Sequence, residues 1–250
     1  MIELRNIAKT YGSYTALQHL NLSVPAGEVF GFIGPNGAGK TTTIKIIGGI
    51  LAPTAGSVKI AGVDMARDPV AAKQRIGFIP DRPYLYEKLT GMEFLQFTAD
   101  VYGVTHAVFQ EKAVTLLEMF ALADWGEELI ESYSHGMKQR LIMCAALLHD
   151  PEVLVVDEPM VGLDPVAIRM VKNLFRDLAR KGVAVFMSTH TLAVAEDICD
   201  RIGIIHRGRL IAEGTLDDLR KDIKGGASDL ESVFINLTQS PVNPGEALTS

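Results

Sequence analysis

The sequence predicts an α/β fold with a mainly parallel sheet, and three observations support that prediction. An apolar run at 29–33 leads into a glycine-rich loop and then into a helix-like stretch. From residue 153 onward, buried strand patterns alternate with amphipathic helix patterns, which is the order that builds a parallel sheet. Between about residues 81 and 150 the pattern is helical instead. We therefore expect a parallel α/β core, an antiparallel β part near the N-terminus and an inserted α-helical subdomain at about 81–150.

Length and charge restrict the class of protein. A chain of 250 residues can bury one full core together with a sizeable insertion. Its formal net charge of −6 argues against a protein that binds nucleic acid by bulk electrostatics, so no nucleic-acid partner is expected. The first residues lack the layout of a signal peptide, and no apolar run approaches the ~18 residues of a membrane span. We expect a cytoplasmic chain whose membrane span, if it acts at a membrane, comes from another chain.

The first half of the chain opens with β elements. Strands are expected at 2–7 and 16–24, and Leu20, Leu22 and Val24 alternate in the second. The strand at 29–33 and the helix after the glycine-rich loop are followed by strands at 57–60 and 76–79. Pro80 and Pro83 then enforce a non-helical loop.

The second half begins with helices and returns to the α/β pattern. Thr90-Gly91-Met92-Glu93 predicts a capping box that opens the first inserted helix. Further helices are expected at 107–120 and 141–148, followed by a strand at 153–156, a helix at 165–180, a strand at 183–187, a helix at 191–199 and a strand at 202–205. A last short helix is expected over 228–238, and residues 239–250 are expected to form a disordered tail.

The glycine-rich loop at 34–41, GPNGAGKT, fits the pattern G-x-x-x-x-G-K-[ST] without a mismatch. Its glycines allow backbone N–H groups to curl around a phosphate, and the following helix presents its unsatisfied N–H groups to the same anion. Lys40 is expected to reach the β- and γ-phosphates, and the Thr41 hydroxyl to bind Mg²⁺. The alternative is a glycine-rich turn with an incidental lysine, but the strand before and the helix after favour a nucleoside triphosphate site.

Polar residues also follow three other predicted strands. Asp157 is placed to hold Mg²⁺, and Glu158 is placed to orient or deprotonate an attacking water. His190 and Asp81 follow the strand patterns at 183–187 and 76–79. A lone acidic pair is commonly a solvated turn, and a lone histidine is commonly a satisfied surface residue. Because ligands bind beyond the carboxyl ends of strands in an open parallel sheet, four polar strand ends beside a phosphate loop favour function.

With these motifs in this order, the chain to about residue 238 resembles the nucleotide-binding subunit of an ATP-binding-cassette (ABC) transporter. The stretch YSHGMKQR at 133–140 stands at the place of the family signature, and 161–165 and His190 match the loop and the switch histidine that follow it. Tyr11 stands where such proteins stack an aromatic ring on adenine, with packing on the sheet edge as the alternative. The phosphate-loop helix, the signature and the closing LESVF resemble bacterial ABC-2-type exporters.

This resemblance implies a P-loop NTPase fold, an ABC ATPase domain over residues 1–238, and ATP and Mg²⁺ as cofactors. It implies catalytic roles for Lys40, Glu158 and His190, and metal binding by Thr41, Asp157 and Asp81. The residues it implies in nucleotide binding are Tyr11, Gly34, Pro35, Asn36, Gly37, Ala38, Gly39, Lys40, Thr41, Thr42, Ser134, Gly136 and Asp164.

The resemblance also implies partners. Ser134 and Gly136 are expected just ahead of a helix and away from the phosphate loop of their own chain. Each ATP would therefore lie between the phosphate loop of one chain and the signature of another, in a head-to-tail dimer with an ABC ATPase chain, expected to be a second copy. A separate polytopic membrane subunit would hold the dimer peripherally on the cytoplasmic face of the cell membrane.

Two positions depart from the family pattern. His135 and Met137 replace a glycine and the glutamine of the usual Leu-Ser-Gly-Gly-Gln, while Ser134 and Gly136 are kept. Asp81 stands where the family has a glutamine that touches Mg²⁺ and couples to the membrane partner. A carboxylate at Mg²⁺ and an Asx-turn residue that caps the following turn are both open for Asp81.

The favoured function is ATP hydrolysis that drives transport, expected to be export, through a separate membrane subunit. One alternative is a soluble ABC ATPase switch that acts on ribosomes or DNA. Such relatives usually carry two cassettes or long coiled coils, and this sequence has neither. A P-loop GTPase or kinase is a second alternative, but the sequence lacks the guanine-reading Asn-Lys-x-Asp pattern.

Overall fold

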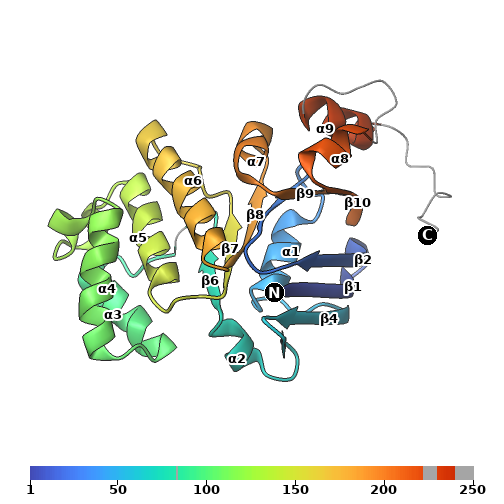
Figure 1. The fold of residues 1–250 in the computed structure, drawn as a ribbon. Coiled ribbons are helices and arrows are strands. Elements are labelled where there is room, and N and C mark those ends of the chain that lie inside the picture. Colours follow the sequence, from blue (N-terminus) through green and yellow to red (C-terminus); the bar gives the residue numbers. More distant parts are fainter. Residues whose placement is uncertain (83, 222–229, 240–250) are drawn as a thin grey trace.

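The computed structural model describes residues 1–82, 84–221 and 230–239 (Figure 1). Gln239, the first residue of the tail expected at 239–250, instead ends the helix Leu230–Gln239. The rest of that tail and the first residues of the helix expected at 228–238 lie outside these described residues.

The central sheet is mainly parallel, as the sequence predicts. In the part of the chain that the structure describes, its strand order is β10-β9-β3-β8-β7-β6, and only the β10 edge is antiparallel. The strands are β3 (Val29–Ile33), β6 (Ile76–Ile79), β7 (Val153–Asp157), β8 (Ala184–Thr189), β9 (Arg201–His206) and β10 (Arg209–Gly214). Ile33 pairs with Thr189 and Asp157 with Ser188, so the carboxyl ends of β3, β8 and β7 lie level.

A second, antiparallel sheet is built from β2 (Tyr14–Val24), β1 (Ile2–Tyr11), β4 (Ala55–Ile60) and β5 (Val63–Asp64). The expected limits of 2–7 and 16–24 are too short, and Tyr11 ends β1 instead of lying in a loop. The register of β1 and β2 shifts several times, and Asn6 and His19 take a positive φ, so the apolar alternation breaks while the pairing continues.

Helix α1 (Lys40–Ile47) lies between the two sheets (Figure 1). Its Ile44, Ile46 and Ile47 pack in one core with Phe32 and Phe186 of the central sheet and with apolar residues of the antiparallel sheet. Because the opposite face of the central sheet is covered as well, β7 and β8 are buried along their whole length. The short helix α2 (Pro69–Lys73), which the sequence analysis did not predict, begins at an Asp68 cap.

The insertion contains α3 (Gly91–Tyr102), α4 (His106–Met119) and α5 (His135–Leu147), grouped at the end of the molecule opposite the antiparallel sheet (Figure 1). The predicted capping box is confirmed: the Glu93 N–H donates to Thr90 Oγ1 over 3.1 Å, and the Thr90 N–H donates to the Glu93 carboxylate over 2.8 Å. Helix α5 begins six residues before the expected position of 141. Gly136 therefore lies inside its first turn and not ahead of it.

The remaining helices cover the central sheet and its β10 edge. They are α6 (Pro165–Arg180), α7 (Leu192–Ile198), α8 (Leu216–Lys221) and α9 (Leu230–Gln239). The limits of α6 are those that the sequence predicts, whereas β10 and α8 were not predicted. No helix among the described residues combines the length and the apolar character that crossing a membrane requires.

Candidate functional site

The carboxyl ends of β3, β8, β7 and β6 meet at one pocket of about 510 Å³. The residues that line it are Asn36, Lys40, Thr41, Asp81, Arg82, His135, Asp157, Glu158, Val161 and His190. The expectation that polar residues at four strand ends lie close together on one rim of the sheet is therefore confirmed.

The shape of the phosphate loop depends on its glycines. A Cβ atom on Gly34 would overlap the carbonyl oxygen of Ile205 on β9. Gly39, the residue before α1, has a φ of 114°, and a Cβ there would lie 2.7 Å from Leu17 Cδ2. Larger residues are excluded at both positions by neighbouring strands and, at Gly39, by the backbone conformation as well.

Lys40 is the first residue of α1 and its side chain is buried in the loop. Its Nζ donates to the carbonyl oxygens of Gly34 and Pro35 over 2.6 and 3.2 Å. Burial lowers the pKa of Lys40, and the nearby carboxylates of Glu158 and Asp157 oppose that shift. A cation is thus held directly under the loop, one residue before the exposed Thr41.

Asp157 is the last residue of β7 and is buried at the floor of the pocket. The hydroxyl of Ser188, on the neighbouring strand β8, donates to Asp157 Oδ1 over 2.7 Å. Burial raises the pKa of Asp157, and the carboxylates of Glu158 and Asp81 raise it further, while the Ser188 hydrogen bond and Lys40 lower it. Three carboxylates therefore crowd one side of the pocket, where a cation would relieve their repulsion.

Glu158 follows in a left-handed backbone conformation, with a φ of 51°. This turn places Glu158 Oε1 at 2.7 Å from Nδ1 of His190, and the Thr189 hydroxyl donates to Oε2 over 3.2 Å. The imidazole is exposed, whereas the carboxylate is largely buried. A carboxylate that is oriented by a histidine and a hydroxyl can take up or guide a proton at the pocket floor.

The signature stretch lies closer to this pocket than expected. Ser134 caps α5 by accepting a hydrogen bond from the Met137 N–H over 3.2 Å. His135, the next residue, lines the pocket and packs against Gly162, where a Cβ would overlap its ring. The expectation that this helix end lies away from the phosphate loop of its own chain is therefore wrong for His135, because the 161–165 loop brings α5 and the pocket together.

Several predicted residues do not line the pocket, namely Gly34, Pro35, Gly37, Ala38, Gly39 and Thr42 of the phosphate-loop segment, Ser134 and Gly136 of the signature, and Tyr11 and Asp164. Tyr11 is about half exposed at the end of β1, with Lys9 Nζ 5.2 Å from its ring centroid. The Asp164 carboxylate caps α6 by accepting from the Ala167 N–H over 2.9 Å. Conversely, the site or its support includes residues that were not predicted as site residues: Arg82, His135, Val161, Ser188 and Thr189. Ser188 and Thr189 could have been found, since they precede His190 at a strand end.

A lysine-bearing phosphate loop between a strand and a helix, with an aspartate and a glutamate at the end of a nearby parallel strand, defines a P-loop nucleotide triphosphatase. Comparison with known proteins places the chain within this class. The family described as ABC transporter matches residues 17–161, more than half of the chain. The chain belongs to the ABC transporter family.

Curated relatives agree with this assignment. The linearmycin resistance ATP-binding protein LnrL of Bacillus subtilis (strain 168) is 38% identical over 243 residues, covering 97% of this chain and 76% of that protein. The "Probable multidrug ABC transporter ATP-binding protein YbhF" of Escherichia coli (strain K12) is 39% identical over 240 residues, covering 95% of this chain. The chain spans 41% of the length of YbhF.

Solved structures share the fold. An ATP-binding subunit of an ABC transporter superposes with a TM-score of 0.90 at 35% identity, covering 95% of this chain and 99% of that one. The ATP-binding cassette MJ0796, solved as a dimer in a post-hydrolysis state with ADP and Pi, gives a TM-score of 0.77 at 27% identity over 86% of this chain and 99% of that one. The expected P-loop NTPase fold and ABC ATPase class are confirmed: the chain is an ATP-hydrolysing, ATP-binding subunit of the ABC transporter type.

Proposed function

We propose that this chain hydrolyses Mg²⁺-ATP as one half of a head-to-tail dimer and drives export through a separate membrane subunit. The observation that carries the proposal is the Glu158 carboxylate, held by His190 and Thr189 in the same pocket as Lys40 and Asp157. The export direction is supported by the relatives, because LnrL is a linearmycin resistance protein and YbhF carries a multidrug transporter name. The dimer and its membrane partner place the chain peripherally on the cytoplasmic face of the cell membrane.

The phosphate loop and α1 bind the phosphates. Lys40 exchanges its bonds to the Gly34 and Pro35 carbonyl oxygens for phosphate oxygens, since both are acceptors for the same ammonium group. Backbone N–H groups at the start of α1 add to the anion site. The residues of this segment that we propose in nucleotide binding are Gly34, Pro35, Asn36, Gly37, Ala38, Gly39, Lys40, Thr41 and Thr42.

The donor atoms at the pocket floor fit Mg²⁺. The Thr41 hydroxyl and the carboxylates of Asp157 and Asp81 are hard oxygen donors in one pocket. Mg²⁺ keeps several waters and takes substrate phosphates as ligands beside a small number of protein oxygens. When bound, the ion supplies positive charge to the reacting phosphates.

Glu158 orients the attacking water and takes up its proton, and His190 positions the carboxylate through its Nδ1 contact. The N-terminus of α5, with Ser134 and Gly136, completes the phosphate site of a second chain. Asp164, which we propose in nucleotide binding, belongs to the 161–165 loop, which lies between the pocket lined by Val161 and the start of α5 at His135. Tyr11, at the end of β1, provides a half-exposed ring for adenine.

Glu158→Gln is the experiment that tests this function. The amide keeps the size of the side chain but cannot act as a base, so turnover should fall roughly 10²–10⁴-fold while ATP still binds. The variant should accumulate as an ATP-dependent dimer, seen as a doubling of mass in light scattering. Ser134→Arg on the same chain should abolish that dimer, because a bulky cation then fills the facing phosphate site.

Near-normal hydrolysis by Glu158→Gln would remove this residue from the mechanism. A variant that loses hydrolysis but stays monomeric in saturating Mg²⁺-ATP would contradict a homodimer, and a pull-down from detergent-solubilised membranes would then identify a different cassette partner. The same pull-down, analysed for a polytopic protein, separates transport from a soluble ATPase switch.

A further inference from the structure

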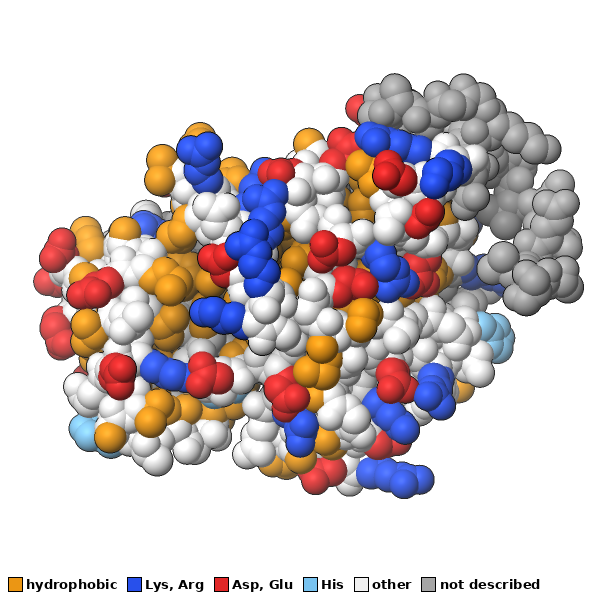
Figure 2. Space-filling model, viewed as in Figure 1, with side chains coloured by type: hydrophobic (Ala, Val, Ile, Leu, Met, Phe, Trp, Pro, Cys, Tyr) orange, Lys and Arg blue, Asp and Glu red, His pale blue; other side chains and the backbone are white. Residues whose placement is uncertain are grey.

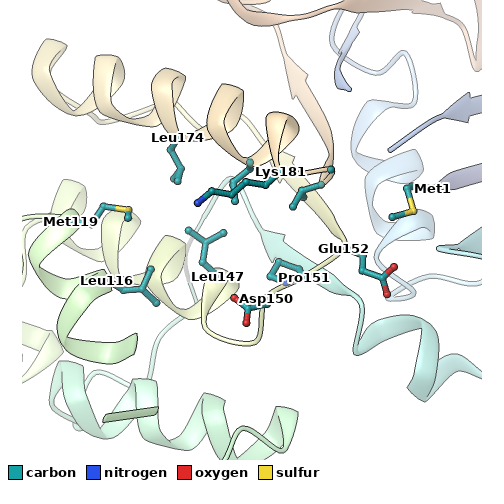
Figure 3. Close-up of a pocket in the computed structure, with 12 residues that line it drawn as sticks. Met1, Leu116, Met119, Leu147, Asp150, Pro151, Glu152, Leu174 and Lys181 are labelled. Atoms are coloured by element: carbon teal, nitrogen blue, oxygen red, sulfur yellow. The ribbon is translucent and has the colours of Figure 1, made fainter. Parts of the chain in front are cut away.

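A second concave region lies at the end of the sheet opposite the phosphate loop. It is a groove of about 580 Å³ (Figure 3). Its lining includes Pro151 and Val183, which lie just before the N-terminal ends of β7 and β8, respectively. Its volume falls within the range of about 300–1,000 Å³ that is typical of small-molecule sites. None of the residues of the proposed ATPase site lines it, so it needs an explanation of its own.

The groove is lined mainly by apolar side chains from two parts of the molecule. Leu116, Met119 and Leu147 come from α4 and α5 of the insertion, and Leu174 and Leu178 come from α6 of the core. Figure 2 shows hydrophobic side chains gathered on this face, over α4, α5 and α6. Met119 is 46% exposed although it is a large apolar residue. A ligand that covers these side chains would gain hydrophobic stabilisation and would contact the insertion and the core together.

The charges at the groove favour an anion. Of the acids that line it, Asp150 is ion-paired with Lys112, and Glu152 is ion-paired with Arg75 at 2.9 Å. Lys181, which follows α6, has no ion-pair partner within the described residues. In Figure 3 its side chain runs from the end of α6 toward Met119 and Leu147. An unpaired cation therefore extends along an apolar wall.

We propose that this groove binds an anionic amphiphile with an unbranched acyl chain, such as a medium-chain fatty-acid anion. The chain lies against Leu116, Met119 and Leu178, and the carboxylate meets the Lys181 ammonium group. Charge complementarity selects this occupant over a neutral or cationic amphiphile, because the acidic side chains of the groove are already paired. Binding here is independent of the phosphate loop and of the dimer proposed above.

The test is a calorimetric titration of the full chain with decanoate below its micelle concentration. We expect saturable binding of one decanoate per chain. Lys181→Glu should weaken the affinity roughly five- to tenfold, as reversal of one surface ion pair implies. Met119→Asp, which puts a charge on an already exposed part of the wall, should weaken it at least as much.

Arg180→Glu is the matched control. It makes the same charge change one residue earlier, at a side chain that pairs with Asp177 and does not line the groove, so decanoate affinity should stay the same. Melting temperatures establish that each variant is folded. Absence of saturable decanoate binding would overturn the proposal. So would equal losses in Lys181→Glu and Arg180→Glu, or equally tight binding of decyltrimethylammonium, which carries the opposite charge on the same chain.

Discussion

At the scale of single residues, Glu158 has an unfavourable backbone conformation, which places its side chain in the pocket. A left-handed φ at a residue other than glycine costs on the order of 1 kcal/mol, and Glu158 has a φ of 51°. The turn takes the chain out of β7 immediately after Asp157, so that two consecutive carboxylates face one pocket from different directions. One is then held by Ser188 and the other by Thr189 and His190. Strain of this kind persists because the surrounding contacts maintain it.

Asp81 provides a prediction about the metal. It lines the pocket, and its carboxylate raises the pKa of Asp157, so the two carboxylates are close enough to repel each other electrostatically. An Asx turn at Asp81 would need the N–H of residue 83, which is a proline and has none. We therefore expect Asp81→Asn to raise the Mg²⁺ concentration needed for half-maximal ATPase activity several-fold. An unchanged Mg²⁺ titration would exclude the metal role.

Ser188 provides a prediction about pH. Its hydroxyl bond is the largest of the influences that lower the pKa of Asp157, against burial that raises it. Ser188→Ala removes this influence, so the pKa of Asp157 should rise further. Because the ionised carboxylate is the form that binds a cation, the acid limb of the ATPase pH profile should move to higher pH. Ser188→Thr, which keeps a hydroxyl, should restore the profile, and identical profiles for all three proteins would count against the argument.

The residues at strand ends could be predicted, whereas their supporting contacts could not. Lys40, Asp157, Glu158 and His190 share a pocket because parallel strands bring their carboxyl ends to one edge, and alternating βα patterns reveal that arrangement. The Ser188–Asp157 bond depends on the register of β7 and β8, which no local pattern specifies. The position of His135 depends on how the insertion packs on the 161–165 loop, which is equally hidden from sequence spacing.

At the scale of elements, α5 shows why helix limits were misjudged. Its first turns carry a glycine, a lysine and an arginine and lack the apolar periodicity that revealed residues 141–148. The informative signal was the Ser134 cap, which binds the Met137 N–H as N-cap residues do. Strand β10 was missed for a related reason: it is a partly exposed edge strand without a continuous buried run.

An exposed apolar surface is made by Tyr84 and Tyr86 of the loop before α3 and by Phe97 and Val101 of α3 itself. The rings of Tyr86 and Phe97 meet edge to face with centroids 5.5 Å apart, and the loop begins close in sequence to Asp81 at the pocket. We propose that this surface docks on the membrane subunit, since exposed aromatic clusters of this kind mark interaction sites. Leu85, by contrast, is half-buried and packs on the helical core, so changing it would disturb the fold.

Tyr84→Glu combined with Tyr86→Glu should therefore uncouple the chain from its membrane partner. ATPase activity of the isolated chain should persist, while association with membrane vesicles from the host cell should fall at least several-fold in a flotation assay. Val70→Glu is the control, because Val70 is a similarly exposed apolar residue on α2, outside the α-helical insertion. Retained association in the double variant would place the docking surface elsewhere.

At the scale of the whole molecule, one chain supplies two different halves of the proposed site. The phosphate loop, Asp157 and Glu158 come from the core, while Ser134 and Gly136 sit at the N-terminus of α5 in the insertion. His135 reaches the pocket of its own chain, but the Ser134 hydroxyl accepts its hydrogen bond at the helix cap and is exposed. A helix end with free N–H groups and an exposed cap is suited to an anion that another chain presents.

This division predicts complementation between two inactive chains. Lys40→Ala disables the phosphate loop and Ser134→Arg blocks the signature, so each homodimer should be inactive. In a mixed head-to-tail dimer one site receives both defects, whereas the other pairs an intact phosphate loop with an intact signature. Each mixed dimer should recover up to roughly half of the hydrolysis of a wild-type dimer, since it has one complete site instead of two. Different affinity tags confirm that mixed dimers form.

Mixed dimers without any recovery would mean that the signature serves its own chain, as the position of His135 would then suggest, or that both sites must fire together. A covalently linked dimer with a single Ser134→Arg separates these two outcomes, because one complete site remains under either arrangement. Hydrolysis by this dimer would show that one site suffices, so the signature would serve its own chain, whereas its inactivity would show that both sites must fire together.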